Sequence, residues 1–212
     1  RFDPIEIDRE RSVVLQEISQ SEDTPDDHIH DLFNEQFWPG HPLGRPVCGT
    51  SDTVAALTRD QFLAFLAERY RPDRLFIAAA GDIPHEVLED WAARDFGDLT
   101  GSASLVDGGP PVARAGLTVT EKALEQVHVC FGVPGTAQAA DERYAACLLN
   151  TVLGGGMSSR LFQEIRERRG HAYSVYSFLS SYRDAGYLGI YVGTSAQWVE
   201  EVVTVIAGEL DA

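Results

Sequence analysis

Apolar residues recur at helical spacing through the first half of the chain, and capping residues mark where helices start. Asp3-Pro4 is typical of a helix start, because Asp caps free backbone N–H groups and Pro fits the first helical position. We expect this helix to run to about Ser21. Thr24-Pro25 repeats the signal for a second helix, through Phe37. The further elements expected are a helix at 61–70 capped by Thr58, an apolar run of strand length at 74–80, and a helix at 84–96.

The second half of the chain contains the clearest strand pattern. Apolar and polar residues alternate over 172–180 and 186–194, and the polar sequence YRD at 182–184 separates the two runs, which predicts a β-hairpin. The other elements expected are strands at 117–119 and 126–133 and helices at 140–153, 158–169 and 196–210. Because helices and strands are mixed with an antiparallel hairpin, the pattern predicts an α+β fold rather than a doubly wound parallel sheet.

A change in composition at 100–115 separates the two halves. The stretch TGSASLVDGGPPVARA is rich in small residues and contains Gly-Gly and Pro-Pro, which favours a linker or a domain boundary. The chain has 212 residues, enough for one large domain or two small ones, so a boundary at this position is compatible with its length.

The charge of the chain limits its partners. There are 33 acidic and 17 basic side chains, which give a formal charge of -16. Nucleic acid is not expected as a partner, because phosphate binding needs clustered Lys and Arg. A membrane is not expected either, because anionic lipids also attract basic residues and no apolar run is long enough to span a bilayer. Three distant cysteines and an N-terminus without an apolar signal region favour a cytoplasmic protein. The missing initiator Met favours a start inside a longer chain.

Two glutamates in the first helix are candidates for a metal site. One helical face carries Ile7, Glu10, Val14, Glu17 and Ser21. Carboxylates at inward positions are costly unless a cation or hydrogen-bond donors meet them. Seven residues span about 10 Å of helix axis, so the two cannot share one small ion directly, although one could ligate a metal while the other orients a ligand. The alternative is that this face is solvated and that Arg11, Leu15 and Ile18 form the buried stripe.

The stretch LGGGMSSRLFQEIRERRGHAYSVYS at 153–177 carries the most information. Gly154, Gly155 and Gly156 could cradle a phosphate at a helix N-terminus, but no Lys follows in the P-loop position. A tight helix-to-helix turn and the close approach of an extended peptide are the alternatives. Arg166 and Tyr173 offer a rigid fork of N–H donors and a hydroxyl, which suit a carbonyl or carboxylate, although surface and half-buried structural positions would also accommodate them.

Three stretches of the sequence resemble the pitrilysin/insulinase family of zinc peptidases, the inverzincins, and are most similar to the processing-peptidase branch. ERSVVLQEI at 10–18 is similar to the helix that supplies the third zinc ligand. HPLGRPVCGT at 41–50 is similar to the loop downstream of that helix. The stretch at 153–177 is similar to the substrate-binding segment of the second family domain.

The resemblance implies a role for each candidate. Glu17 would ligate Zn²⁺, Glu10 would be the acid that supports the metal site, and Arg166 and Tyr173 would grip a peptide or unfolded protein substrate. It also implies two incomplete α/β-sandwich units joined by a linker. They would be 1–99, the C-terminal half of a zinc-binding domain, and 116–212, the N-terminal part of a substrate-binding domain, with the linker at 100–115. A homodimer or a paired half-subunit would be a possible assembly.

The chain departs from the family pattern in one respect. It has no H-x-x-E-H motif, in which two His bind zinc and the Glu activates a water molecule. None of the six His of the chain lies in such a motif, and His28 and His30 are expected to be solvated. A catalytic zinc site normally needs three protein ligands, so we expect this chain alone to be metal-free and inactive. The intact protein is expected to be a zinc metalloendopeptidase that uses a metal-activated water. The alternative is a non-catalytic scaffold or partner subunit of the same fold.

Overall fold

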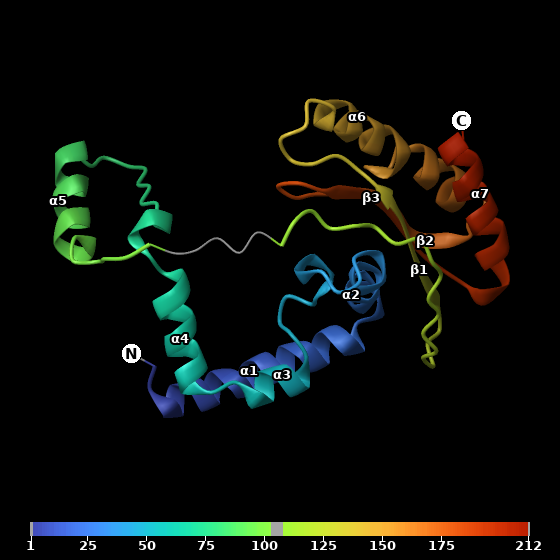
Figure 1. The fold of residues 1–212 in the computed structure, drawn as a ribbon. Helices are drawn as coiled ribbons and strands as arrows, with labels where there is room; N and C mark the ends of the chain where they lie inside the picture. Colours follow the sequence, from blue (N-terminus) through green and yellow to red (C-terminus); the bar gives the residue numbers. More distant parts are fainter. Residues whose placement is uncertain (1, 103–107, 212) are drawn as a thin grey trace. The chain divides into compact units, whose positions relative to one another are not determined.

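The computed structural model describes residues 2–102 and 108–211 (Figure 1). Contacts group the chain into two compact units. One comprises residues 1–16 and 50–108, and the other comprises 17–49 and 109–212. The grouping is not linear along the chain, because 17–49 joins the later residues. Of the expected linker at 100–115, residues 103–107 lie outside the described part of the chain.

The first unit is helical. Its helices are the N-terminal part of α1 (Pro4–Asp23), α3 (Ser51–Ala56), α4 (Arg59–Arg69) and α5 (His85–Phe96), with a 3-10 turn at Pro72–Arg74. α4 begins where the sequence indicates, because Thr58 and Gln61 form a reciprocal capping box. Arg11 joins α1 to α3: its Nε donates to the carbonyl oxygen of Val54 at 3.3 Å and its Nη2 to that of Leu57 at 2.7 Å.

The strand expected at 74–80 does not form. The segment after the 3-10 turn is irregular, and Phe76 is 94% exposed. The physical reason is the lack of a partner, because a strand needs another strand to pair its backbone groups and the described residues of this unit contain none.

The second unit contains a three-stranded sheet. Its strands are β1 (Val127–Pro134), β2 (Ala172–Ser181) and β3 (Gly186–Thr194). The spatial order is β1-β3-β2, and both pairings are antiparallel, so the expected hairpin and the strand near 126–133 are confirmed. All nine residues of β3 are buried, as expected for a central strand that is covered on both faces.

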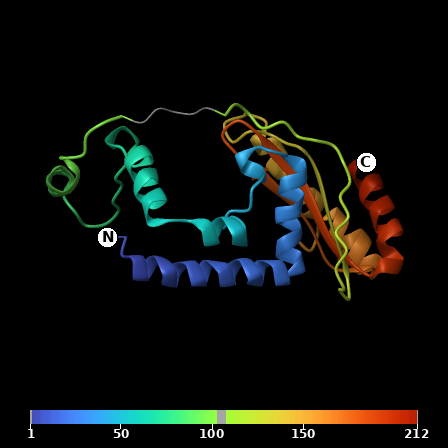
Figure 2. The same ribbon diagram turned by 60° about the horizontal axis from the view of Figure 1, so that its bottom comes forward.

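Helices cover the two faces of this sheet. Alternate β3 residues point to opposite faces, so Leu188, Ile190 and Val192 pack in a cluster with residues of α6 (Arg143–Gly154) and α7 (Val199–Asp211). Tyr187 packs on the other face with residues of α2 (Pro25–Phe37). Figure 2 shows α2 and α7 on opposite sides of the strands. This arrangement confirms the expected α+β class, while the two α/β-sandwich units stay a prediction.

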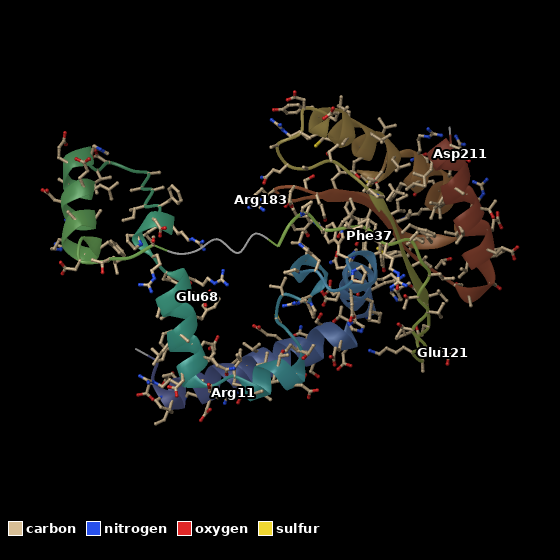
Figure 3. All side chains as sticks on the ribbon, in the orientation of Figure 1. Arg11, Phe37, Glu68, Glu121, Arg183 and Asp211 are labelled. Carbon is tan, nitrogen blue, oxygen red and sulfur yellow. The ribbon has the colours of Figure 1, made fainter. Side chains whose placement is uncertain are left out.

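Aromatic rings form the core between α2 and the sheet. Tyr187 of β3 has its ring centroid 5.4 Å from that of Phe37 and 5.3 Å from that of Trp38. Figure 3 shows Phe37 among the side chains of this unit and Arg183 at the turn of the hairpin.

None of the helices in the described ranges is long and apolar enough to cross a membrane.

The short strand expected at 117–119 also does not form. Leu117 is 89% exposed and Val119 is 77% exposed. The hydroxyl of Thr118 donates to the side-chain oxygen of Gln36, and the N–H of Arg114 donates to the carbonyl oxygen of Phe37 at 2.9 Å. The segment therefore bonds to the end of α2 instead of pairing with β1.

Candidate functional site

Arg166 and Tyr173, which the sequence indicates as a pair, come together at the surface of the second unit. The guanidinium carbon of Arg166 lies 4.9 Å from the centroid of the Tyr173 ring. It also lies 4.9 Å from the centroid of the Phe162 ring. The cation therefore contacts two aromatic rings, a favourable arrangement because the ring faces are electron-rich.

Arg166 and Phe162 belong to a π-helix, Phe162–Arg168, where the sequence predicts an ordinary helix. Leu161 and Ile165 anchor this segment, and both are fully buried. Gly170 follows this segment, and its φ of 65° is readily accessible to glycine. Single-turn π-helical segments are rare and frequently occur at functional sites.

Tyr173 lies in a second irregularity, a bulge at the start of β2. Ala172 is opposite Thr194 and Ser174 is opposite Gly193, so Tyr173 has no residue opposite it in β3. Its side chain is 77% exposed. A bulge re-aims a side chain relative to the regular alternation of a strand, and here the ring of Tyr173 meets Arg166.

The charges around this pair leave Arg166 available. Arg168 and Arg169 both pair with Glu164, the latter at 2.7 Å. In the described part of the chain, the ion pair formed by Arg166 is with Glu167, at a long 4.0 Å. The guanidinium N–H groups can therefore donate to an external acceptor such as a peptide carbonyl or a carboxylate.

The three glycines at the end of α6 have different surroundings. A Cβ at Gly154 would lie 2.3 Å from the backbone nitrogen of Ser177 in β2, so this glycine lets helix and strand approach closely. A Cβ at Gly155 would lie 2.8 Å from the Cα of Thr151, whereas one at Gly156 would meet no heavy atom within 4 Å. Gly154 thus fits the tight-turn alternative, and Gly156 leaves bare backbone at the surface.

Glu10 and Glu17 are both exposed on α1. Ile18 is buried and Arg11 and Leu15 are partly buried, but Val14 on the face of the two glutamates is partly buried too, so burial favours neither face alone. The role of Glu17 as a metal ligand stays a prediction.

The residues present do not by themselves form a zinc site. Within residues 2–102 and 108–211, no three His, Cys, Asp or Glu side chains lie close enough together to bind one metal ion. Two carboxylates separated by two helical turns cannot replace such a cluster.

A group of histidines and tyrosines on the α2 face of the sheet was not expected from the sequence. His30, expected to be solvated, is half-buried, and its Nε2 lies 3.1 Å from the Tyr176 hydroxyl. Nδ1 of His128 lies 2.9 Å from the Tyr191 hydroxyl. Burial lowers the pKa of His30 and raises that of Tyr191 to about 12. The regular spacing of these rings along the strands could have indicated an aromatic layer, but not its pairing with α2.

A cavity of about 650 Å³ lies beside this layer, between α2, β1 and the segment 113–124. Its lining includes Ile29, Leu32 and Phe33 of α2 and His128 and Cys130 of β1. Neither Arg166 nor Tyr173 lines it, so the cavity and the surface pair are separate features.

The fold and the surface pair define a class of protein: an α+β domain whose antiparallel sheet is covered by helices and which displays a cation between two aromatic rings. The chain belongs to the peptidase M16 family, because the family model described as the peptidase M16 inactive domain matches residues 56–212. This match confirms the family resemblance of the sequence. The match starts within the range 1–99 that we assigned to the first domain, and that assignment stays a prediction.

Curated relatives extend the comparison. An uncharacterized zinc protease of Streptomyces coelicolor is 42% identical over 97% of this chain and 47% of its own length. An uncharacterized zinc protease of Bacillus subtilis is 39% identical over 95% of this chain and 49% of its own length. The chain thus spans about half the length of the curated relatives it matches.

Solved structures share the fold. A crystal structure of a peptidase M16 inactive domain from Pseudomonas fluorescens has a TM-score of 0.89 at 24% identity, over 99% of this chain and 52% of the other. A protease from Helicobacter pylori has a TM-score of 0.83 at 18% identity, over 97% of this chain and 52% of the other.

Proposed function

We propose that this chain is part of a zinc metalloendopeptidase that cleaves extended peptides. It contributes Arg166 and Tyr173 as peptide-binding residues and Glu17 as a zinc ligand. The observation that carries the proposal is the guanidinium of Arg166 between two aromatic rings, without a close carboxylate among the described residues. Relatives named zinc proteases, at about 40% identity, support it.

The chemistry of the pair suits a peptide. A guanidinium presents several N–H donors in one plane and binds a carbonyl or a terminal carboxylate, while the exposed hydroxyl of Tyr173 adds a donor or acceptor beside it. Gly156 at the end of α6 has no neighbour that a side chain would contact, so a peptide backbone can approach it. The net charge of -16 favours basic segments as substrates.

Glu17 supplies a carboxylate that no described residue engages. In an intact protein with the length of the relatives, the two His of an H-x-x-E-H motif would complete its ligand set, and Glu10 would support the site. Because those groups are not in this chain, we derive no catalytic step from the residues present.

The second candidate function is a non-catalytic subunit of the same fold. One observation favours it: the family model that matches residues 56–212 is described as an inactive domain. The two functions differ in whether the intact protein binds zinc and cleaves peptides.

The test uses the intact protein and compares Glu17→Gln with Glu22→Gln, an exposed glutamate five residues later on α1. Zinc content and hydrolysis of an internally quenched peptide are measured for each variant. We expect Glu17→Gln to abolish both and Glu22→Gln to change neither. Retained hydrolysis in the Glu17→Gln protein would refute the ligand assignment. A wild-type protein that neither binds zinc nor cleaves peptides would establish the non-catalytic alternative.

A further inference from the structure

We propose that Phe162 is a positioning residue for Arg166, and that its ring fixes the plane of the guanidinium so that the N–H edge meets an acceptor oxygen of an extended peptide. The inference rests on the proposed function, since it assigns Arg166 a peptide as its partner. It adds a residue that the sequence pattern did not indicate as part of the site.

The geometry of the sandwich supports this role. The guanidinium carbon lies at the same distance, 4.9 Å, from the Phe162 and Tyr173 rings. The two rings differ in support: Tyr173 is 77% exposed, whereas Phe162 is half-buried and follows the fully buried Leu161. The Phe162 ring is therefore held more firmly by its surroundings, whereas solvent and a ligand can reach the Tyr173 ring.

Ion pairs do not account for the orientation of Arg166. Its contact with Glu167 is 4.0 Å long and involves neighbouring, exposed side chains, so it is weak. The nearby Glu164 pairs with Arg168 and Arg169 instead. The rings are thus the main contacts that orient the guanidinium, and a cation held over ring faces keeps its N–H donors available to an acceptor.

Phe162 and Arg166 lie four residues apart on the same π-helix, a spacing that brings helical side chains together. Leu161 and Ile165 are buried, and they fix the segment against the core. Phe162 and Arg166, each next in sequence to one of these anchors, then both come to the surface. The bulge at Tyr173 completes the site from the strand side. Two local irregularities therefore converge on one cation.

The chain contains a matched control. On α6, the guanidinium carbon of Arg143 lies 4.3 Å from the centroid of the Tyr144 ring. Tyr144 is 65% exposed and belongs to the same unit. Tyr144→Leu removes a ring from an arginine without touching the proposed site.

The test measures binding by the 212-residue chain of a fluorescein-labelled ten-residue peptide rich in Gly, Ser and Arg, using fluorescence anisotropy. Phe162→Leu should raise the Kd roughly three- to tenfold, because the guanidinium loses its firmer aromatic contact. Phe162→Tyr should restore the wild-type Kd, and Tyr144→Leu should not change it. Circular dichroism verifies folding, and Phe162→Met replaces Phe162→Leu if the latter is unfolded.

A second readout reports the stacking itself. In the wild-type chain, the proton on Nε of Arg166 should resonate upfield of an ordinary arginine, because it lies near two ring faces, and Phe162→Leu should reduce that shift. An ordinary wild-type resonance would overturn the proposal without any variant.

The outcomes separate the two proposals. If Arg166→Ala weakens binding but Phe162→Leu does not, Phe162 does not position Arg166 and the proposed function stands. If Arg166→Ala binds like the wild type, or the wild type does not bind the peptide, the peptide role of Arg166 fails, and the role of Phe162 fails with it.

Discussion

Replacing Gly154 by Ala should destabilise the second unit strongly. The new Cβ would lie 2.3 Å from the backbone nitrogen of Ser177 and 2.6 Å from its Oγ. Backbone cannot rotate away as a flexible side chain can, so α6 or β2 has to move. Overpacking of this kind typically costs about 1–3 kcal/mol. The shift also threatens the hydrogen bond from the Ser177 hydroxyl to the carbonyl oxygen of Asn150, worth about 1 kcal/mol. Together they predict a loss of about 2–4 kcal/mol.

Gly156→Ala is the control, two residues away in the same turn. A Cβ there would meet no heavy atom within 4 Å, and Gly156 is not among the glycines with positive φ. The substitution should therefore be neutral or should stabilise the chain by about 0.4–1 kcal/mol, because alanine restricts the unfolded state. Gly154→Ala is therefore expected to lower the free energy of unfolding, and Gly156→Ala is expected not to lower it.

The assay is urea unfolding followed by tryptophan fluorescence in a Trp91→Phe background. Trp91 belongs to the first unit, so this background leaves Trp38 and Trp198, both in the second unit, as probes. A Gly154→Ala variant within about 0.5 kcal/mol of its background would refute the close-approach argument. Equal destabilisation by Gly156→Ala would show that the turn as a whole is sensitive, and the steric explanation would be wrong.

Three further predictions concern protonation, reactivity and metal binding. Burial lowers the pKa of His30 below 6.5, so as the pH falls the unfolded chain binds a proton at this residue before the folded chain does. The free energy of unfolding should therefore fall between pH 7.5 and 5.5. Urea midpoints should show this fall, and it should be less steep in His30→Gln. Burial raises the pKa of Cys130 to about 12, so iodoacetamide at pH 8 should label the exposed Cys48 and Cys147 but leave Cys130 unmodified until urea is added, as mass spectrometry would count. The 212-residue chain should hold no zinc after dialysis by atomic absorption, and one tightly bound ion per chain would contradict this.

The sequence pattern predicted much of the second unit, because the alternation of apolar and polar residues along a strand is a local property. The alternation at 172–180 and 186–194 fixes which residues face inward, and β2 and β3 form as expected. The resemblance named Arg166 and Tyr173 as a pair, and their role toward a peptide stays a prediction. The π-helix and the bulge on which these two residues lie were not anticipated, because neither leaves a mark in the spacing of apolar residues.

The wrong predictions have a common cause: the sequence does not show which segment packs against which. The apolar run at 74–80 has strand composition, but a strand forms only where another backbone accepts its hydrogen bonds. Phe76 remains 94% exposed for that reason. His30 shows the converse: its polar side chain suggested solvent, yet the aromatic layer of the sheet covers it and Tyr176 satisfies its ring nitrogen. Periodicity indicates which face is apolar, but it does not identify what packs against that face.

The same reasoning decides how the exposure of Glu17 should be interpreted. A carboxylate is costly only where it is removed from water without a compensating cation, and in this chain nothing removes it from water. Its exposure therefore agrees with a solvated helix face, and it agrees equally with a ligand whose metal is bound jointly with groups outside these residues. The two cases differ in energy only when zinc is present. Loss of zinc from the intact Glu17→Gln protein, with Glu22→Gln unchanged, is therefore the measurement that separates them.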